Sequence, residues 1–440
     1  MSERPNHPNP ANRKQLQDSM TTAKEHRVEI NRERLLDRFL RYVRVGTAAN
    51  PDSDAYPSSP SQRDLGQMLC KEMAEMTIVD AHQDDSALVW GTVPATDGGS
   101  SPTVALVAHV DTSPEAPSEN VDPQVVEAYA GGDIPLNAGN TITVASCPAL
   151  ESLVGKTLVT TDGTTLLGGD DKAGVAIIME LAHTLIENPH LMHGPVRLLF
   201  TCDEEIGRGT DKIDLDKLDA TVAYTLDGGS AGVIDVETFS ADAAIVRFIG
   251  HNIHPAIAKD RMINALRGAS DFVAALPRNT LTPETTSGRE GFIHPHTISG
   301  GVGEATVELI LRSFETADLV KYAEQIRELA DSVAGQMPGL KVEVEIRRQY
   351  RNLREGLKDL PEAISLAEQA FENLGRPCTK AIIRGGTDGS QLTEKGLPTP
   401  NLSSGQHNIH SVTEFACLDE MVEATEQLIE MLSLWSQCKS

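Results

Sequence analysis

Short groups of histidine and carboxylate residues stand where apolar stretches of this chain begin or end. They are His109 with Asp111, Asp170 with Asp171, Glu204 with Glu205, Asp227, and His407 and His410 followed by Glu414. Imidazole nitrogens and carboxylate oxygens, without a set of thiolates, are the donors typical of a two-zinc site. A structural zinc finger is not indicated, because the six cysteines are scattered and form no Cys-x-x-Cys pair.

Each group taken alone has a simpler explanation. Asp170 and Asp171 precede an apolar run over 175–182, so a helix N-cap with a solvated neighbour explains them as well. Glu204 and Glu205 follow the apolar run 196–201, where an acidic turn is the simpler interpretation. Two like charges this close raise each other's pKa unless a cation is present, so one can be a metal ligand and the other a general base. The joint occurrence of the groups, not any single one, favours a metal site.

His109 and Asp111 follow the apolar run 104–108. Residues i and i+2 of a strand point to the same face, so Asp111 can orient the imidazole of His109 while that ring binds metal. Asp227 ends the run 223–226 and is followed by two glycines, where a turn aspartate is the simpler interpretation. Sites in open α/β sheets gather at the carboxyl ends of strands, which is where these residues stand.

Composition narrows the classes of partner. The 440 residues carry a formal net charge of −26, which argues against nucleic acid or an anionic membrane as partner and is compatible with small substrates and cations. No stretch approaches the ~18 consecutive apolar residues of a membrane span, and the first residues contain no apolar segment typical of a secretory signal. The scattered cysteines are typical of free thiols in a reducing compartment, so a cytoplasmic location is expected.

The periodicity of apolar residues predicts an α/β fold with an interruption. Residues 1–28 are polar and aperiodic and are expected to form a flexible leader. Helices alternate with short apolar strands over 29–238 and again over 351–440, which indicates a layered catalytic domain with a mixed sheet between helices. Residues 239–350 instead have an α+β pattern and are predicted to form an inserted smaller domain.

The individual elements follow from the same patterns. Helices are predicted over 30–45, around 65–73, and over 175–182, 264–275, 319–333, 363–374 and 418–435. Strands are predicted over 103–108, 158–161, 196–201, 221–226, 243–249, 305–311, 342–346, 381–384 and 399–402, and an irregular connection over 121–143.

The chain resembles a dinuclear-zinc metallopeptidase family that includes aminoacylases, succinyl-diaminopimelate desuccinylase and glutamate carboxypeptidases. Within that family it is most similar to the tripeptide aminopeptidases, from about residue 30 to the C-terminus. The segments that carry the resemblance are 109–114 (HVDTSP), 131–134 (GGDI), 166–174 (LLGGDDKAG), 203–207 (DEEIG), 224–229 (YTLDGG), 252–255 (NIHP), 291–292 (GF), 384–389 (RGGTDG), and His410 with Glu414.

The resemblance implies a role for each matching residue. His109, Asp170 and Asp227 would bind one zinc ion, Asp170, Glu205 and His410 the second, and Asp170 would bridge the two. Glu204 would be the general base and later the acid, with Asp111 orienting His109. The family spacing His-x-x-x-Glu selects His410 with Glu414, although His407 stays open as an alternative ligand.

The resemblance reaches beyond the metal ligands. It implies that His254, in the inserted domain, reaches a catalytic site and stabilises the oxyanion, and that this domain is a lid or dimerisation domain, which suggests a homodimer. Arg384, with Arg312 and Asn264 as further candidates, would bind the carboxylate of the peptide. Asp171 would fix the geometry of Asp170, with a cis peptide bond between the two.

The predicted activity is hydrolysis of the N-terminal residue from tripeptides, with Glu204 accepting the proton of a zinc-activated water. The nearest alternative is a carboxypeptidase or N-acyl-amino-acid amidohydrolase of the same family, against which the segment 384–389 argues. A non-catalytic peptide-binding scaffold is a third interpretation, which predicts a broken ligand set or a missing base. Side-chain preference among tripeptides is left open.

Overall fold

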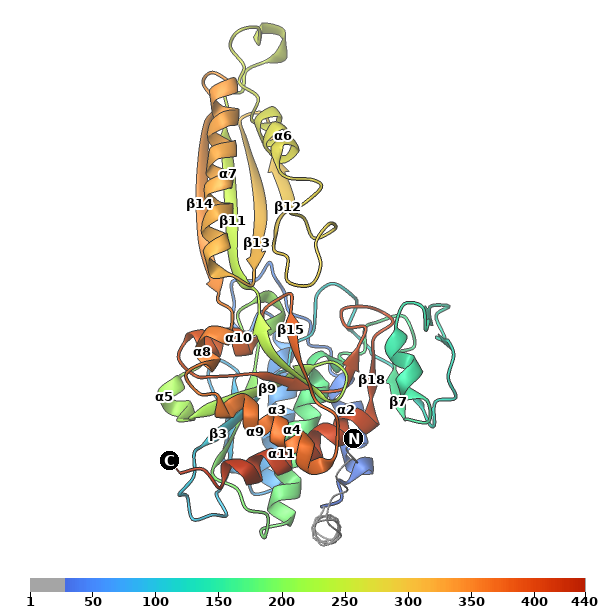
Figure 1. The fold of residues 1–440 in the computed structure, drawn as a ribbon. Coiled ribbons are helices and arrows are strands. Elements are labelled where there is room, and N and C mark those ends of the chain that lie inside the picture. Colours follow the sequence, from blue (N-terminus) through green and yellow to red (C-terminus); the bar gives the residue numbers. More distant parts are fainter. Residues whose placement is uncertain (1–27, 440) are drawn as a thin grey trace, which may run out of the picture.

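The computed structural model describes residues 28–439, so all of the predicted leader except Val28 lies outside the described residues. The described chain folds into a large α/β domain and a smaller domain that projects from it (Figure 1). The predicted architecture, a mixed sheet between helices with an additional smaller α+β domain, is confirmed.

An eight-stranded mixed sheet forms the centre of the large domain within residues 28–439. Neighbouring strands follow the order β1 (Val79–Gln83), β2 (Val89–Val93), β8 (Val196–Thr201), β3 (Val104–His109), β9 (Val222–Gly228), β16 (Asn401–Ser403), β10 (Val233–Thr238) and β15 (Thr379–Ile383). Strands β8, β3, β9 and β16 run parallel to one another, so their carboxyl ends meet at one edge of the sheet. Their near-continuous apolar residues fit a sheet that is covered on both faces.

Helices cover both faces of this sheet. The first face packs against α4 (Gly169–Glu187), which is buried along most of its length because apolar residues occupy nearly every turn. Around α4 lie α2 (Arg32–Val43), α3 (Ser61–Glu75), α9 (Glu362–Leu374) and α11 (Leu418–Trp435). The opposite face packs against α5 (Leu215–Leu218) and α10 (Asp388–Glu394), and α8 (Arg354–Leu357) lies beside β10.

A separate lobe of the large domain has its own small core. Its antiparallel sheet has the order β17 (Gln406–His407), β18 (Phe415–Cys417), β7 (Leu158–Thr160) and β4 (Gln124–Val126), followed by the hairpin β5 (Ile134–Pro135) and β6 (Thr141–Ile142) and the 3-10 helix η1 (Pro148–Leu153). The expectation of an irregular connection over 121–143 was therefore wrong in part, because these strands are too short to produce a periodic apolar pattern.

The smaller domain is an antiparallel sheet with helices on one face (Figure 1). Its strand order is β12 (Phe292–Gly300), β13 (Glu304–Ser313), β11 (Ser240–Ile249) and β14 (Lys341–Tyr350), and its helices are α6 (Ala265–Ala275), α7 (Thr316–Gln336) and the 3-10 helix η3 (Pro255–Ile257). Ala241 pairs with Tyr350 at the base, next to the large domain, and Ile249 pairs with Lys341 at the far end. Alternate residues of β13, and of most of β11, are buried against the helices.

Two further expectations concern the whole chain. Across residues 28–439, no helix combines the length and apolar character needed to cross a bilayer. The six cysteines are unpaired, as predicted, and Cys147, Cys202 and Cys417 are buried.

Candidate metal centre and active site

Strand ends bring the first group of predicted residues together. His109 is the last residue of β3, Asp227 lies near the end of β9, and the 3-10 helix η2 (Glu204–Ile206) follows β8. Because these three strands are parallel neighbours, their carboxyl ends meet, and His109 is 2% exposed. His109 Nε2 lies 4.0 Å from Asp227 Oδ1.

Asp170 lies at the start of α4 and faces this edge of the sheet. Gly168, the residue before α4, has φ +81, a conformation that favours glycine, and the peptide bond between Asp170 and Asp171 is cis. One Asp170 oxygen, Oδ1, lies 3.0 Å from His109 Nε2, and the other, Oδ2, lies 3.3 Å from His410 Nε2. A single carboxylate therefore joins the two histidines through its two oxygens.

The second half of the site is made by His410 and Glu205. His410 Nε2 lies 3.0 Å from Glu205 Oε2. The ligand atoms of His109, Asp170 and Glu205 all lie within 4.8 Å of one another, and the same holds for His109, Asp171 and Asp227. Asp171 accepts hydrogen bonds from the backbone N–H groups of His109 and Gly174. Its carboxylate therefore connects the end of β3 to the first turns of α4.

The buried negative charge of this cluster favours the binding of a cation. Burial raises the pKa of Glu205 to about 7 and that of Asp227 well above its usual range, and the charge of Asp170 adds to both shifts. Buried carboxylates this close ionise together only beside a compensating positive charge. Within the described residues, Glu205 Oε1 is buried without a hydrogen-bond partner. Two imidazoles, several carboxylates and this unpartnered oxygen fit metal ions that prefer nitrogen and oxygen ligands, zinc among them.

Glu204 lies next to the cluster and lines the same cavity. Burial raises its pKa well above the usual range, and the negative charges of Asp388 and Asp227 add to the effect. The backbone N–H groups of Glu204 and Glu205 donate to Asp111 Oδ1 and Oδ2, each at 3.1 Å. His109 Nδ1 lies 3.1 Å from the backbone oxygen of Asp111 and 3.4 Å from Asp111 Oδ1, so Asp111 contacts both the imidazole and the turn that carries the two glutamates.

His407, the alternative ligand histidine, contacts Glu420 and Phe415 instead of Asp170. Its Nε2 lies 2.7 Å from Glu420 Oε2, and its ring stacks on Phe415 with centroids 4.7 Å apart. His410, not His407, is therefore the histidine that contacts Asp170.

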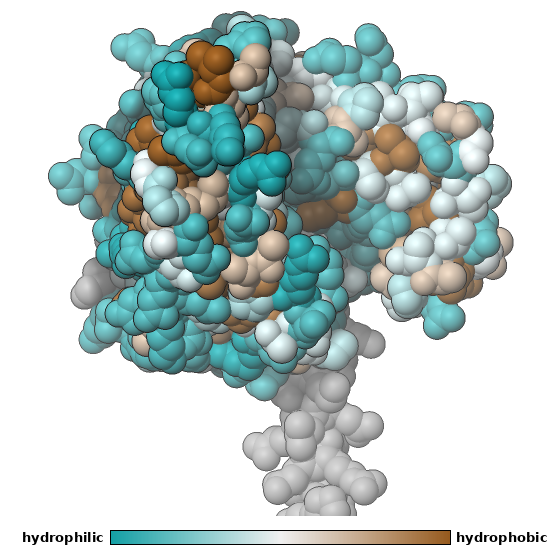
Figure 2. All heavy atoms as spheres, turned by 90° about the horizontal axis from the view of Figure 1, so that it is seen from above, coloured by the Kyte–Doolittle hydropathy of each residue, from teal (hydrophilic) through white to brown (hydrophobic). Residues whose placement is uncertain are grey.

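A cavity of about 1020 Å³ opens over the cluster. Its lining includes Glu115 from the segment between β3 and β4, Cys147 from the lobe, and Arg312 and Tyr350 from the base of the smaller domain. Figure 2 shows the surface hollowed between the lobe and the smaller domain. Two of the three residues predicted to bind substrate line it. Arg312 donates through Nη1 to Gln349 Oε1, and its guanidinium lies 5.4 Å from the centre of the Tyr350 ring.

The other lining arginine, Arg384, is held by the smaller domain. Its two Nη atoms donate to the carbonyl oxygens of Thr286, Gly288 and Glu290, and its guanidinium packs over the rings of Phe239 and Phe292. Arg384 thus joins the end of β15 to the loop before β12.

The remaining predicted residues, His254 and Asn264, are not brought to this cavity within the chain. His254 is exposed at the start of η3, where its Nδ1 accepts from Ala256 N–H, and Asn264 caps α6. Both lie toward the far end of the smaller domain, because β11 carries the chain away from the large domain over ten residues.

Some residues of the site were not assigned a role from the sequence. Glu414 appeared only as a spacing partner of His410, yet its carboxylate accepts three backbone N–H groups of the segment that carries Asp170. Asp388 belongs to the segment 384–389 that carried the resemblance, but it was given no role. Its Oδ2 accepts a hydrogen bond from Thr201 Oγ1 at 2.7 Å, and its Oδ1 is buried without a partner among the described residues. Asp235, which also lines the cavity, lies in the strand β10, which was not predicted because acidic and apolar residues alternate in it.

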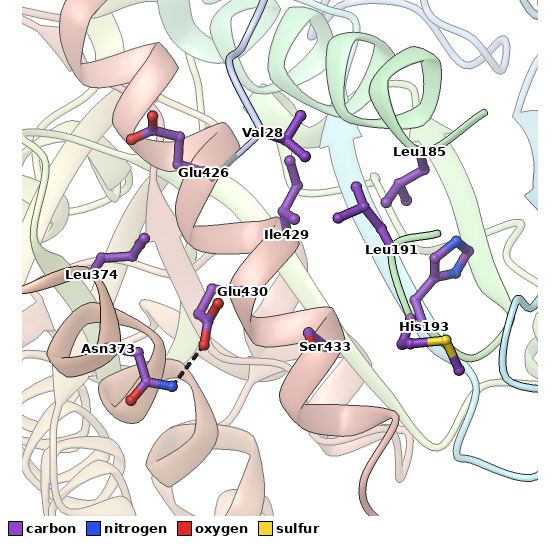
Figure 3. A pocket seen from close by; sticks show the side chains of 11 residues that line it. Val28, Leu185, Leu191, His193, Asn373, Leu374, Glu426, Ile429, Glu430 and Ser433 are labelled. Atoms are coloured by element: carbon purple, nitrogen blue, oxygen red, sulfur yellow. Dashed lines mark hydrogen bonds between the residues drawn. The ribbon is translucent and has the colours of Figure 1, made fainter. Parts of the chain in front are cut away.

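A second cavity, of about 410 Å³, lies away from these residues between α4, α9 and α11. Figure 3 shows Val28, Leu185, Leu191 and Ile429 on one side of it, and the hydrogen-bonded pair Asn373 and Glu430 on the other. Neither three-residue group with metal-ligand geometry found in residues 28–439 lies there.

Comparison with known proteins identifies the family of the chain. Residues 161–433 match the family described as Peptidase family M20/M25/M40. The chain is 41% identical to peptidase T of Geobacillus sp. (strain WCH70) over 405 residues, which cover 92% of this chain and 98% of that protein. The chain therefore belongs to the M20/M25/M40 peptidase family. Its most similar curated relatives include several peptidase T proteins, so the resemblance found in the motifs is confirmed.

Solved structures share the fold. Aminopeptidase PepT of Bacillus cereus superposes with a TM-score of 0.71 at 23% identity, over 92% of this chain and 99% of that one. A tripeptidase of Staphylococcus aureus gives 0.73 at 22% identity, over 93% and 100%. A dinuclear metal binding peptidase of the M20 family from Bacillus subtilis gives 0.61 at 15% identity, over 92% and 98%.

Proposed function

We propose that this peptidase is a zinc-dependent aminopeptidase that removes the first residue of tripeptides. The observation that carries the proposal is Asp170, whose two oxygens lie 3.0 Å from His109 Nε2 and 3.3 Å from His410 Nε2. A carboxylate placed between two imidazoles in this way is suited to bridging two metal ions. The names of the relatives, peptidase T and a tripeptidase, support the substrate class.

The residues present fit two ions. His109 and Asp227 would hold one, Glu205 and His410 the other, and Asp170 both. The dinuclear metal site of the Bacillus subtilis neighbour supports this stoichiometry. When bound, the two ions would supply Lewis acidity for the scissile carbonyl and for the attacking water.

Glu204 is the proposed general base. Glu204 lines the cavity next to the cluster, and Asp111 accepts a hydrogen bond from its backbone N–H. Its raised pKa suits a group that takes a proton from water and later passes it to the leaving amine. A carboxylate with its ordinary pKa would be a weaker base near neutral pH.

The peptide carboxylate is assigned first to Arg312. Arg384 has both Nη atoms engaged by carbonyl oxygens of the loop 286–290, whereas the hydrogen bonds of Arg312 run through Nη1. Asn264 and His254 lie toward the far end of the smaller domain, so their proposed roles require a second copy of the chain whose smaller domain reaches this cavity. A homodimer is thus part of the proposal for these two residues.

The test measures metal content together with turnover. Protein loaded with zinc should contain two ions per chain and hydrolyse Ala-Ala-Ala, releasing alanine and Ala-Ala. Treatment with a chelator should abolish turnover, and zinc should restore it. Turnover that survives complete metal removal would refute the metal-dependent mechanism.

A substrate panel separates the family alternatives. Ala-Ala-Ala should be cleaved much faster than Ala-Ala, Z-Gly-Ala or N-acetyl-methionine. Efficient cleavage of peptides or amino acids with a blocked N-terminus would instead favour a carboxypeptidase or an N-acyl-amino-acid amidohydrolase.

A further inference from the structure

Asp235 is a buried carboxylate in the wall of the catalytic cavity. It lies on β10, is 8% exposed and lines the cavity together with Ile382 and Ile383 of β15. Asp235 Oδ2 accepts a hydrogen bond from Asn401 Nδ2 at 2.9 Å. Oδ1 accepts no hydrogen bond from residues 28–439 and is not fully enclosed by them. Because Asp235 lines the cavity, this oxygen is open to it. One oxygen is therefore held in place while the other is available to a ligand.

No cation balances Asp235 within the described residues. Glu237, two positions further along β10, is equally buried but forms ion pairs with Arg289 and Arg354 at 2.6 and 2.8 Å. Asp235 has no such pair, and burial raises its pKa. Burying a carboxylate without a cationic partner is costly, so an unpaired one that faces a substrate cavity points to a cationic ligand.

Asn401 links Asp235 to the metal centre. Its Nδ2 donates to Asp235 Oδ2 and also, at 3.1 Å, to the backbone oxygen of Asp227. Its Oδ1 accepts from Asp227 N–H at 3.0 Å. Asp235 is thus one amide group away from a proposed metal ligand, on the side of the centre formed by β16 and β10.

Besides the proposed base Glu204, the cavity has one other carboxylate outside the metal cluster, and it does not offer the same environment. Glu115 has 69% of its side chain exposed and lies 3.3 Å from His410 Nδ1. A charge pair is stronger where water is excluded, so Asp235 is the better anchor for an ammonium group.

We propose that Asp235 binds the α-ammonium group of the peptide substrate and so makes the enzyme selective for a free N-terminus. This inference rests on the proposed aminopeptidase function and adds to it the group that recognises the end of the chain to be cleaved. In a peptide, two covalent bonds separate the α-nitrogen from the scissile carbonyl carbon, so its anchor has to lie beside the metal centre, as Asp235 does. The arginines assigned to substrate bind the opposite end, the carboxylate.

The experiment measures binding without turnover. Zinc-loaded Glu204→Gln and Glu204→Gln/Asp235→Asn proteins are titrated calorimetrically with Ala-Ala-Ala and with propionyl-Ala-Ala, which lacks the ammonium group. The Asp235→Asn substitution preserves side-chain volume, and its amide oxygen can still accept from Asn401. We expect it to weaken Ala-Ala-Ala binding by about 10- to 100-fold, the range of a hydrogen bond to a charged group, and to leave propionyl-Ala-Ala unchanged. Equal losses for both ligands, or no loss, would overturn the proposal.

Two controls sharpen this result. The first control, Glu204→Gln/Glu115→Gln, removes one negative charge from the same cavity and should still bind Ala-Ala-Ala more tightly than propionyl-Ala-Ala. If it loses Ala-Ala-Ala affinity as strongly as the Asp235 variant does, the effect is a general one of charge and contradicts a specific contact.

The second control compares Lys-Ala-Ala with norleucyl-Ala-Ala and tests the side-chain ammonium. A loss confined to Lys-Ala-Ala would assign Asp235 to side-chain selection and refute the α-ammonium role.

The proposed function is judged separately. If zinc-loaded wild-type protein fails to hydrolyse Ala-Ala-Ala, the aminopeptidase assignment fails, while the titrations still decide whether Asp235 recognises an ammonium group. If wild-type protein cleaves Ala-Ala-Ala and the titrations show no dependence on Asp235, only the present inference fails. Metal content and thermal melting of every variant confirm that site and fold are intact.

Discussion

Glu414 holds Asp170 in place where the lobe meets the rest of the large domain. Asp170 N–H donates to Glu414 Oε1 at 3.0 Å, while the N–H groups of Leu167 and Gly168 donate to Oε2 at 2.8 and 2.9 Å. Glu414 is 1% exposed, so its carboxylate replaces water for three backbone donors just before and at the start of α4. The orientation of Asp170 toward both histidines therefore depends on a residue near the other end of the chain.

Glu414→Ala should destabilise the protein and weaken metal binding. Each buried donor left without a partner costs about 1–3 kcal/mol, so we expect a loss of at least about 3 kcal/mol in the free energy of unfolding. Urea denaturation of the metal-free protein measures this loss, and titration with zinc measures affinity. Glu414→Gln keeps one oxygen acceptor and should lie between wild type and Glu414→Ala; equal stability of all three proteins would contradict the role of this carboxylate.

Glu204→Gln should lower turnover strongly while leaving the metal centre intact. The amide cannot accept the proton of the attacking water, so kcat for Ala-Ala-Ala should fall by about 10²- to 10⁴-fold. Zinc content, measured by elemental analysis, should remain at the wild-type value, because Glu205 and His410 are untouched. Near-wild-type kcat in a protein with full zinc would remove Glu204 from the mechanism.

Gly209→Ala should disturb the turn that carries Glu204. A Cβ atom at Gly209 would lie 1.9 Å from Asp388 Oδ1 and 2.6 Å from Asp388 Cγ, so either Asp388 or the turn has to move. Overpacking of this kind costs about 1–3 kcal/mol, and the displaced turn should lower kcat as well. Thermal melting and tripeptide turnover check both effects. Gly335→Ala, in α7 with no atom within 4 Å of its added Cβ, is the matched control and should leave activity unchanged.

Glu237 gives the contact between the domains a defined pH dependence. Burial opposes its ionisation, but hydrogen bonds from Arg289 and Asn352 outweigh burial and lower its pKa below the usual 4.5. The unfolded chain then binds the proton more readily than the folded chain, so the stability from this group is present above pH 4.5 and is lost as the pH falls through the folded-state pKa. The measurement compares the free energies of unfolding of wild type and Glu237→Gln between pH 7 and pH 3. Their difference should shrink on acidification, and a constant difference would contradict the assignment.

Much of the architecture could be predicted from the sequence, because apolar periodicity reports burial directly. The long run after Asp171 is α4, and the runs before His109, Cys202 and Asp227 are the central strands β3, β8 and β9. Elements with weaker patterns were not predicted. Strand β12 is interrupted by Pro295 and is exposed over its second half, and β10 alternates acidic with apolar residues, so neither shows the apolar run of a buried strand.

The sequence by itself determined which residue types the site contains and which family the chain belongs to. Short motifs can be read directly from the chain, so His109, Asp170, Glu204, Glu205 and His410 could be named without coordinates. Their roles as ligands and base stay predictions, to be tested by the variants above.

Only the tertiary structure decided which of these side chains meet. The chain joins β3, α4, β8, β9 and the β17–β18 loop through long connections, so their mutual distances depend on packing rather than on sequence separation. Packing directs His410, not His407, toward Asp170, because Glu420 and Phe415 hold the ring of His407 elsewhere. Packing also places Asp235 unpaired in the wall of the cavity while Glu237, two residues away, is neutralised by arginines. The sequence pattern of β10 does not distinguish Asp235 from Glu237, and only their neighbours in space show what each side chain faces.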